Sequence, residues 1–241
     1  MNQRLLQQFL GAGGSGGPPS YPELDAAITA AGPALWWEAR KEMGYSDGAS
    51  VYSVTEWVDG IYSLTNGNAS YYPTFKASGI NGIPSFEFNG TQCLYRKGGW
   101  SFSQPFSYFV VAQHLDLSST RRMFDGNITV NRVMADKVST GFWRYYSGSS
   151  IYGTSTPDTN AHLFEVAYNG ASSYMNVDNT LEASGDSGNR PTDNICMGAT
   201  YNAVSGIIGY ISLLLIFSTP PTGATKEAMI SEIATVYGLT L

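Results

Sequence analysis

The sequence is poor in charged residues. Asp, Glu, Lys and Arg make up only 13% of its 241 residues, and the formal net charge is −6. A nucleic-acid partner needs a basic surface, and an anionic membrane attracts one for the same reason. The densest basic cluster, Arg121-Arg122, is too small to provide it. We therefore expect neither nucleic acid nor an anionic membrane as a partner.

Cysteines and long apolar runs are also scarce. Cys93 and Cys196 lack the CxxC spacing, so they cannot build a zinc or redox site alone. They would pair only if the fold joined them, and the alternative is two buried free thiols in a reducing compartment. The apolar run 206–217 is shorter than the about 20 residues that span a bilayer, which predicts a buried strand and no membrane insertion. Residues 1–10 lack a continuous apolar region and a cleavage site, so we expect no signal peptide.

The clearest structural signal lies in residues 162–178. Phe164, Val166 and Tyr168 alternate with polar or smaller residues, which is the period of a strand with one buried face. The dipeptide Asn169-Gly170 follows, and it is well suited to a type I′ hairpin turn. A second alternating run begins at Ser173. These features predict an antiparallel hairpin.

Two helices are expected at the borders of the β-rich body. Residues 22–31 begin with Pro22 and are followed by Gly32-Pro33, which favour a helix start and a helix stop. Near the C-terminus, Thr225 is the expected cap of a helix that ends at Gly238. One face of that helix carries four large residues, namely Met229, Ile230, Ile233 and Tyr237.

The first residues read as a separate element. Residues 1–10 place Leu5, Leu6, Phe9 and Leu10 on one face of a short helix, and a Gly-rich stretch with two prolines follows. A helix this short is marginal alone in water, so its apolar stripe must dock on its own domain, on a second copy of the chain or on a larger assembly. We predict an anchor peptide and linker over residues 1–19, and one domain over residues 20–241.

Ten short fragments follow one another in a recognisable order: the Trp pair Trp36-Trp37, Trp57-Val58-Asp59, the run 81–90, the strand 106–110, Phe124-Asp125, the hairpin with Asn169-Gly170, Val177-Asp178, Met197-Gly198-Ala199, Gly209-Tyr210-Ile211 and Val236-Tyr237-Gly238. Their order resembles the concanavalin A-like lectin/glucanase superfamily, and within it the laminin-G-like modules of bacteriophage structural proteins. The module usually has Asp-Gly where this chain has Asp178-Asn179. Asn accepts the left-handed conformation that this position needs.

The resemblance implies an all-β fold, a two-sheet antiparallel jelly-roll sandwich with short N-terminal helices and one C-terminal helix. It also implies a bacteriophage virion protein, a decoration, head-fibre or tail appendage made in the host cytoplasm. Other virion proteins would bind residues 1–17, and the domain would display a lectin-like face to host-surface glycans, as a monomer or a homo-oligomer. The alternative is a free lectin or receptor-binding module, with a degenerate glycoside hydrolase ranked below it.

Catalytic and metal-binding patterns are not found. The hydrolases of the superfamily carry a Glu-x-Asp-x-Glu strand, and this run is missing here, so we predict that the chain is not an enzyme and has no catalytic residues. His114 and His162 each stand alone in a β pattern and are expected to be structural. Many relatives bind Ca²⁺ at a loop rim, but no spacing here predicts a metal site. No cofactor is expected.

Carbohydrate binding has the better support from residue chemistry. Residues 142–152 are rich in aromatics, and Arg144 and Tyr146 share the face of a strand opposite Trp143 and Tyr145. Tyrosine and tryptophan provide rigid, amphipathic contact surfaces. Trp100, in a Gly-Gly-Trp-Ser sequence read as a turn, is a second candidate for exposure. We therefore predict that Trp100, Arg144, Tyr146 and Tyr152 contact a glycan.

Overall fold

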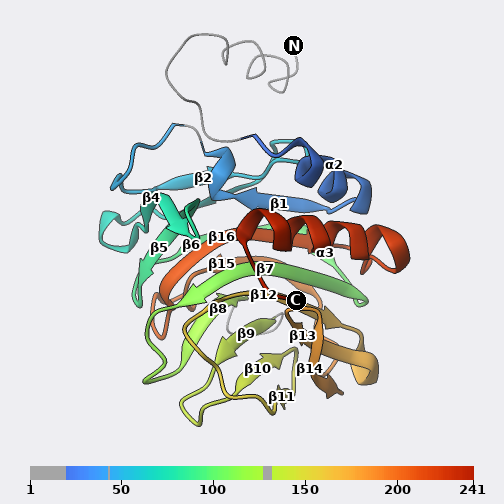
Figure 1. Ribbon diagram of the computed structural model, residues 1–241. Helices are drawn as coiled ribbons and strands as arrows, with labels where there is room; N and C mark the ends of the chain where they lie inside the picture. Colours follow the sequence, from blue (N-terminus) through green and yellow to red (C-terminus); the bar gives the residue numbers. More distant parts are fainter. Residues whose placement is uncertain (1–19, 43, 127–131) are drawn as a thin grey trace.

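The computed structural model describes residues 20–42, 44–126 and 132–241. Within these ranges, two antiparallel sheets of eight strands each pack face to face, and two α-helices lie on the outer side of one sheet (Figure 1). The predicted all-β, two-sheet jelly-roll sandwich is confirmed. The anchor predicted in residues 1–19, with Leu5, Leu6, Phe9 and Leu10, lies outside the described residues.

The first sheet, sheet A, carries the helices. Strand β1 (Leu35–Glu38) pairs with β16 beyond the point where β5 stops, so it continues the same edge of β16. The other strands, in spatial order, are β14 (Thr180–Gly185), β13 (Ser173–Val177), β12 (Ala161–Tyr168), β7 (Phe106–His114), β16 (Ile208–Phe217), β5 (Ile83–Asn89) and β4 (Thr74–Ile80).

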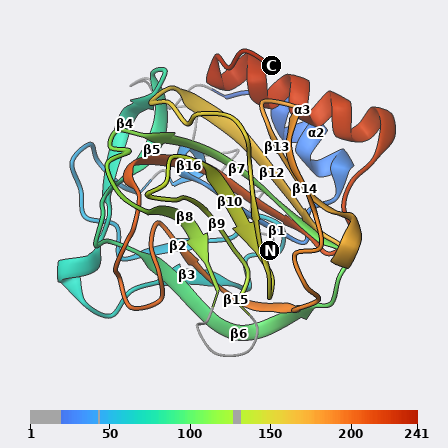
Figure 2. The same cartoon turned by 90° about the horizontal axis from the view of Figure 1, so that it is seen from below.

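The second sheet, sheet B, has no helix on its outer side among the described residues (Figure 2). Its strands, in spatial order, are β11 (Ser150–Tyr152), β10 (Trp143–Tyr146), β9 (Met134–Lys137), β8 (Arg121–Asp125), β15 (Thr192–Met197), β6 (Leu94–Phe102), β3 (Ser63–Thr65) and β2 (Ser53–Thr55). Three short 3-10 helices lie in the connections, namely η1 (Ala39–Lys41), η2 (Ala69–Tyr71) and η3 (Gly170–Ser172).

The central strands of sheet A are apolar on both faces because each face is covered. On β7, Tyr108 and Val110 point into the space between the sheets, while Phe109 and Val111 point toward the helices. A strand buried on both sides reads as a continuous hydrophobic run rather than as an alternation. This explains the apolar run 206–217, which forms β16 with neighbours on both edges and is a buried strand, as predicted.

Buried tyrosines join the two sheets across the interior. The Tyr108 hydroxyl lies 2.6 Å from Thr192 Oγ1, and the Tyr168 hydroxyl donates to the Met134 carbonyl oxygen at 2.8 Å. In the opposite direction, Tyr145 of sheet B donates to the Ser173 carbonyl oxygen at 3.0 Å. A buried phenol needs a hydrogen-bond partner, and these partners also fix how the two sheets face each other.

The predicted hairpin is formed by β12 and β13, but its turn differs from the prediction. Asn169 has a φ of −151°, so the type I′ turn expected at Asn169-Gly170 is wrong. The Gly170 amide donates to Gln104 Oε1 at 2.6 Å, and Ser173 Oγ accepts from the Asn169 amide at 2.8 Å. These tertiary contacts favour the longer connection through η3.

Type I′ geometry occurs at two other turns. Asn81 and Gly82 have φ values of 49° and 85° between the register partners Ile80 and Ile83. Asp178 and Asn179, with φ values of 50° and 60°, join β13 to β14. The prediction that Asn179 takes the left-handed conformation is confirmed.

Helices α2 (Pro22–Ala31) and α3 (Gly223–Tyr237) lie side by side over sheet A (Figure 2). Each ends at a glycine in the left-handed conformation, Gly32 or Gly238, as predicted. The cap expected at Thr225 is wrong, because α3 begins two residues earlier and Thr222 precedes it. All four residues predicted for the buried face of α3 are buried. No helix in the described ranges is long and apolar enough to cross a membrane.

A buried polar cluster fixes the helices to sheet A. Glu38 of β1 accepts hydrogen bonds from Trp36 Nε1 at 3.0 Å and from the Tyr237 hydroxyl of α3 at 2.7 Å. Arg40 pairs with Glu38 and also with Asp25 of α2. One carboxylate therefore connects β1 with α3, and Arg40 extends that connection to α2.

Candidate functional site

The outer face of sheet B is covered by no helix of the described ranges, and it carries polar and aromatic side chains. Alternate residues of these strands, such as Leu94, Ile195 and Ala135, belong to the core between the sheets, so the residues beside them point outward. The outward residues of the central strands are Tyr95, Lys97, Asn194, Cys196, Arg122, Asp125, Asp136, Arg144 and Tyr146. This face is where the candidate site lies.

A pocket opens at the β6 side of this face. Its volume of about 370 Å³ lies within the range of about 300–1,000 Å³ that small-molecule sites occupy. Three segments far apart in sequence form it: the η2 turn, the start of β6 and the loop after β15. The lining residues are Asn66, Gly67, Asn68, Tyr71, Cys93, Tyr95, Tyr201, Asn202 and Ala203.

The pocket offers aromatic faces together with uncommitted polar groups. The rings of Tyr95 and Tyr201 meet edge to face at 5.2 Å, and Lys97 Nζ lies 4.0 Å from the centre of the Tyr201 ring. Among the described residues, no hydrogen bond is made by the hydroxyls of Tyr71, Tyr95 and Tyr201. The side-chain amide of Asn202 is equally uncommitted within those ranges. Flat apolar surface beside free donors and acceptors suits a ligand whose rings carry hydroxyl groups.

One wall of the pocket is held in place by Asn66. Its Nδ2 donates to the Cys93 carbonyl oxygen at 2.9 Å and to Cys93 Sγ at 3.3 Å, and its Oδ1 accepts from the Asn68 amide at 3.0 Å. The side chain of Asn66 therefore hydrogen-bonds neighbouring residues of the fold and holds the pocket wall in place. Asn68 Oδ1 accepts from the Ser70 amide at 3.0 Å, which starts the η2 turn that carries Tyr71.

The opposite wall is a loop with an unusual backbone. Ala203 and Ser205 have φ values of 55° and 54°. The other non-glycine residues with positive φ in the described ranges are Asn or Asp in turns, which tolerate that conformation far better than alanine does. Backbone strain of this kind is concentrated at functional sites, because the surrounding structure must impose it. Here the strained residues adjoin Tyr201 and Asn202.

The two cysteines lie together beneath this pocket. Both are free and buried, and they pack with Ala199 and Ala203. A hydrogen bond from the Cys196 thiol lowers the pKa of Cys93, while burial raises the pKa of Cys196. The fold therefore brings together two residues that the sequence places 103 positions apart, and both are thiols in this structure.

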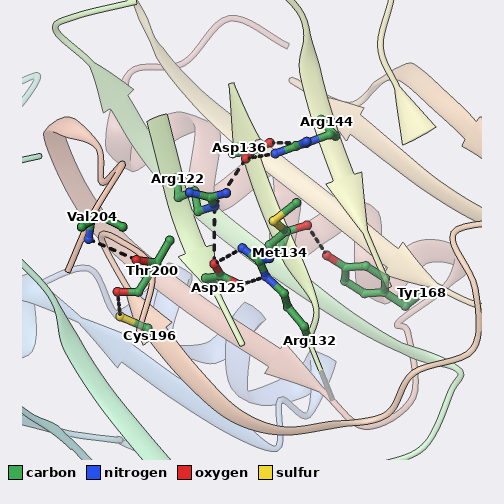
Figure 3. A network of polar contacts seen from close by, with 10 residues as sticks. All are labelled: Arg122, Asp125, Arg132, Met134, Asp136, Arg144, Tyr168, Cys196, Thr200 and Val204. Atoms are coloured by element: carbon green, nitrogen blue, oxygen red, sulfur yellow. Dashed lines mark hydrogen bonds and ion pairs between the residues drawn. The ribbon is translucent and has the colours of Figure 1, made fainter. Parts of the chain in front are cut away.

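An alternating row of arginine and aspartate crosses the centre of the face (Figure 3). Arg132 donates to both carboxylate oxygens of Asp125 at 2.7 Å, and Arg144 donates to those of Asp136 at 2.9 and 2.5 Å. Arg122 lies between the two carboxylates, with its Nε 3.4 Å from Asp125 and 3.6 Å from Asp136. Both aspartates are fully buried, since their relative exposure is 0%.

The middle arginine of the row is the least well compensated. Its two carboxylate contacts are long for hydrogen bonds, and its buried Nε makes none within the described part of the chain. Burial lowers the pKa of Arg122, and the charges of Arg132 and Arg144 lower it further against the opposing effect of the two aspartates. The hydrogen bond to Asp125 raises the pKa of Arg132. Each outer arginine therefore has a bidentate carboxylate partner, while Arg122 has none.

Three of the predicted glycan contacts lie at the β11 edge of the same face. Tyr152 is 51% exposed, and the Arg144 guanidinium lies 6.0 Å from the centre of its ring. Tyr146 is half-buried, with Arg190 at 5.4 Å from its ring centre. Arg144 itself is committed to Asp136, which the sequence pattern did not indicate. Four strand spacings of about 4.8 Å separate β10 from β6, so this edge lies roughly 19 Å from the pocket.

Trp100 is not exposed, which corrects the prediction made for it. It lies within β6 rather than in a turn, is 9% exposed and belongs to the core between the sheets. Gly98 and Gly99, with φ values of 67° and 96°, belong to the strand, and the Trp100 ring packs against Phe102 at 5.2 Å. The Gly-Gly pair resembles a turn in sequence, but the strand continues through it.

Both histidines lie on sheet A, away from the pocket. His162 lies between two carboxylates, with Nδ1 2.5 Å from Asp178 and Nε2 2.9 Å from Asp158. The type I′ turn at Asp178-Asn179 brings Asp178 to this position. Burial lowers the pKa of His162, but the hydrogen bonds to Asp178 and Asp158 outweigh this effect and raise the pKa overall. No group of three or more metal-ligating side chains occurs within the residues that the structure describes.

The sequence did not point to the pocket, because its residues come from three separate segments. None of Tyr71, Tyr95 and Tyr201 follows a periodic pattern with the others. A usable signal was composition: the loops 65–72 and 198–206 combine tyrosine with asparagine, serine and glycine. Adaptable binding loops share this composition.

Comparison with known proteins gives a fold but no family. No protein-family model matches the chain, and no curated protein matches its sequence. Trypanosoma rangeli sialidase with the inhibitor DANA matches with a TM-score of 0.57 and 12% identity, over 99% of this chain and 38% of that chain. Its complex with sialic acid matches with a TM-score of 0.56 and 10% identity, over 88% and 34%. The chain therefore spans little more than a third of the sialidase chains that it matches.

A second kind of neighbour is matched over most of its length. Domain 4 of AbnA, a GH43 extracellular arabinanase from Geobacillus stearothermophilus, in complex with arabinotriose, matches with a TM-score of 0.51 and 15% identity. The match covers 68% of this chain and 81% of that one. At these identities the likeness shows the architecture alone, which occurs within carbohydrate-active proteins.

The neighbours contradict the prediction that the chain is not an enzyme, since they are sialidases and a domain of an arabinanase. That prediction rested on one missing pattern, the Glu-x-Asp-x-Glu strand. The inference was too broad, because sialidases use a tyrosine nucleophile and do not need a carboxylate pair of that kind. The bacteriophage link, in turn, rests on the sequence fragments alone.

Proposed function

We propose that this protein is a carbohydrate-binding domain and that the tyrosine–asparagine pocket is its sugar site. The observation that carries the proposal is a set of three tyrosines around a cavity of about 370 Å³, whose hydroxyls form no hydrogen bond with any residue that the structure describes. Each ring offers a flat apolar surface to a sugar ring, and each hydroxyl can donate to or accept from sugar hydroxyls. The neighbour bound to arabinotriose supports a glycan as the ligand, because it shares the architecture.

Binding is tested with a glycan array followed by calorimetry on the glycan that gives the strongest signal. Tyr201→Ala should weaken that binding by about tenfold or more, since stacking on one aromatic side chain is typically worth about 1–3 kcal/mol for a flat ring. Tyr201→Phe should retain most of the stacking and lose only the hydroxyl contact. The matched control is Tyr52→Ala, because Tyr52 is 59% exposed and does not line the pocket. Equal affinities for Tyr201→Ala and Tyr52→Ala would contradict the assignment.

Glycoside hydrolysis is the second candidate, and the enzymatic neighbours favour it. It ranks below binding because the pocket is lined by no Asp, Glu or His among the described residues. The same mixtures of protein and glycan are analysed for shortened oligosaccharides. Products that appear with the natural chain and not with Tyr201→Phe would identify a hydrolase whose phenol takes part in the reaction.

Attachment to a virus particle is a separate proposal that rests on the sequence. Its support is the apolar stripe of Leu5, Leu6, Phe9 and Leu10 followed by a Gly-rich tether. Particles assembled with the full chain should carry it, and particles assembled with a chain that lacks residues 1–17 should not. Imaging both kinds of particle tests this prediction. Equal decoration of the two would show that residues 1–17 are not the anchor.

A further inference from the structure

Four arginines lie on the outer face of sheet B, although the chain as a whole has a net charge of −6. Arg122, Arg132 and Arg144 share the two buried aspartates of the central row. Arg190 adds a fourth guanidinium against the Tyr146 ring and forms no ion pair within the described residues. Among these six residues the arginines therefore outnumber the aspartates by two.

The surplus charge is held in a partly desolvated position. The side chains of Arg122, Arg132 and Arg144 are only 14%, 21% and 17% exposed. Holding a cation out of water without a full complement of anions is costly. Each guanidinium has five N–H donors, and the carboxylates reach only some of them. An incoming anion with two oxygens could accept from the remaining donors and compensate the charge.

The arginine row lies one strand away from the tyrosine pocket. The Arg122 amide donates to the Ser205 carbonyl oxygen at 2.9 Å, and the Ile207 amide donates to the Arg122 carbonyl oxygen at 3.0 Å. Arg122 is thus bonded to the loop that carries Tyr201. Across the sheet, Cys196 is the register partner of both Asp125 and Tyr95, so only β15 separates the row from the pocket.

We propose that the glycan bound by this face is anionic: one sugar ring occupies the tyrosine pocket, and a carboxylate or sulfate group on an adjoining residue binds Arg122. Arg190 supplies further positive charge toward the β11 edge. The spacing supports this arrangement, since two strand spacings of about 4.8 Å, or roughly 10 Å, separate β6 from β8. The inference rests on the proposed function of the pocket, and it adds the charge class of the ligand.

The experiment compares charged and neutral forms of the same saccharide by calorimetry at low salt. An oligogalacturonide and its methyl ester form the carboxylate arm, and a sulfated galactan oligosaccharide and its desulfated form are the sulfate arm. In at least one arm the charged form should bind ten or more times more tightly than the neutral one. Arg122→Lys keeps the charge but removes the planar pair of donors, so it should lower the preference for the charged form.

Arg190→Gln is the second variant, because Arg190 forms no ion pair with a described residue and its loss should leave the fold intact. It should reduce the affinity for the charged form at least threefold and leave the neutral form unchanged. The matched control is Arg96→Gln, whose guanidinium also lies over a tyrosine ring, at 4.9 Å from Tyr62. Equal affinities for both forms in both arms, or equal effects of the two Arg→Gln variants, would overturn the proposal.

Inorganic sulfate separates failure of this inference from failure of the proposed function. A saturable shift of the Arg122 Nε–Hε resonance on sulfate addition, absent in Arg122→Lys, supports the anion site even if no saccharide binds, and then the sugar assignment alone fails. Saccharides that bind without regard to charge, with no sulfate response, leave the sugar site standing and refute the anion site. No response to sulfate and no saccharide binding would refute both.

Discussion

The two outer faces of the sandwich are built on opposite principles. The outer face of sheet A is apolar and is covered by α2 and α3, with Phe109 and Leu213 packed beneath them. The outer face of sheet B has no such cover in the described ranges, and its centre is a row of paired charges beside a tyrosine pocket. The same strand architecture thus yields one face that is covered by helices and one face that we propose contacts a ligand.

The comparison indicates which interactions stabilise each face. Sheet A gains from apolar surface that the helices remove from water. Sheet B must instead balance buried charges, and a balanced pair contributes little while a broken pair is expensive. Substitutions on the two faces should therefore differ in kind, and the following predictions run from the largest expected effect to the smallest.

Removing a buried carboxylate from sheet B should have the largest effect. Asp136→Ala leaves Arg144 and Arg122 without their shared anion, and breaking a buried pair in this way costs about 3–5 kcal/mol. Urea unfolding measures the loss in the free energy of unfolding. Glu23→Ala is the matched control, because Glu23 is exposed and should change stability by no more than about 0.5 kcal/mol. A loss below about 1 kcal/mol for Asp136→Ala would show that the row is not balanced as described.

Truncating a buried side chain between α3 and sheet A should lower the free energy of unfolding slightly less. Ile233 of α3 is fully buried, and Ile233→Ala should lower the free energy of unfolding by about 2–4 kcal/mol through lost burial and the cavity left behind. Glycan affinity should be unchanged, since the change lies on the other sheet. Ile61→Ala is the control, because Ile61 is 64% exposed. If Ile233→Ala weakened glycan binding as much as Tyr201→Ala, the two faces would not be independent.

The hydrogen bond between α3 and β1 should contribute less again. Tyr237→Phe removes the donor to Glu38 within a buried cluster, and such bonds to charged groups are worth about 1.5–3 kcal/mol. Tyr62→Phe removes a bond of the same length, 2.7 Å, to the exposed Gly99 carbonyl oxygen, and it should cost less than about 1 kcal/mol. Thermal and urea unfolding of both variants test the difference. Equal losses would mean that burial of the Glu38 cluster is unimportant.

The two histidines extend the comparison to pH. His114 points into the core near Trp143 and Phe164, and burial lowers its pKa to about 3. Its folded form resists protonation, so its contribution to stability is present above the unfolded pKa of about 6.5 and is lost as the pH falls toward 3. His162 has a raised pKa, so its contribution is complete below about 6.5 and is lost as the pH rises through the folded pKa.

Unfolding curves at a series of pH values test the opposite pH dependences that are predicted for the two histidines. Each histidine changes stability by at most about 1.4 kcal/mol per pH unit. Relative to His114→Gln, the natural chain should lose stability as the pH falls below 6.5, and relative to His162→Gln it should lose stability as the pH rises above 6.5. NMR titration of the two rings provides a direct check. A His114 ring that titrates near its ordinary pKa would show that it is not enclosed as described.

The fold could be predicted from the sequence because its signals are local. The alternation from Phe164 to Tyr168 identified β12, and Gly32 and Gly238 marked the ends of both helices. The turn after β12 could not be predicted, since Gln104 hydrogen-bonds Gly170 across 66 residues. Trp100 was misplaced for a related reason, because pairing with β15 carries β6 through two glycines.

The candidate site was predicted only in part. The alternation of Trp143 and Tyr145 with Arg144 and Tyr146 correctly gave the inward and outward faces of β10. The pocket depends on tertiary structure, since Tyr71, Tyr95 and Tyr201 meet only after three segments converge. Arg144 was read as a free donor because sequence does not show that Asp136 is its register partner on β9.

The most direct test of the two-face account is hydrogen exchange, measured along the whole chain with and without the oligosaccharide that binds best in the array. The account predicts new protection in residues 66–71, 93–97 and 198–205, and unchanged exchange in α2 and α3. Protection confined to the helix layer, or to the exposed edges of sheet A, would contradict it.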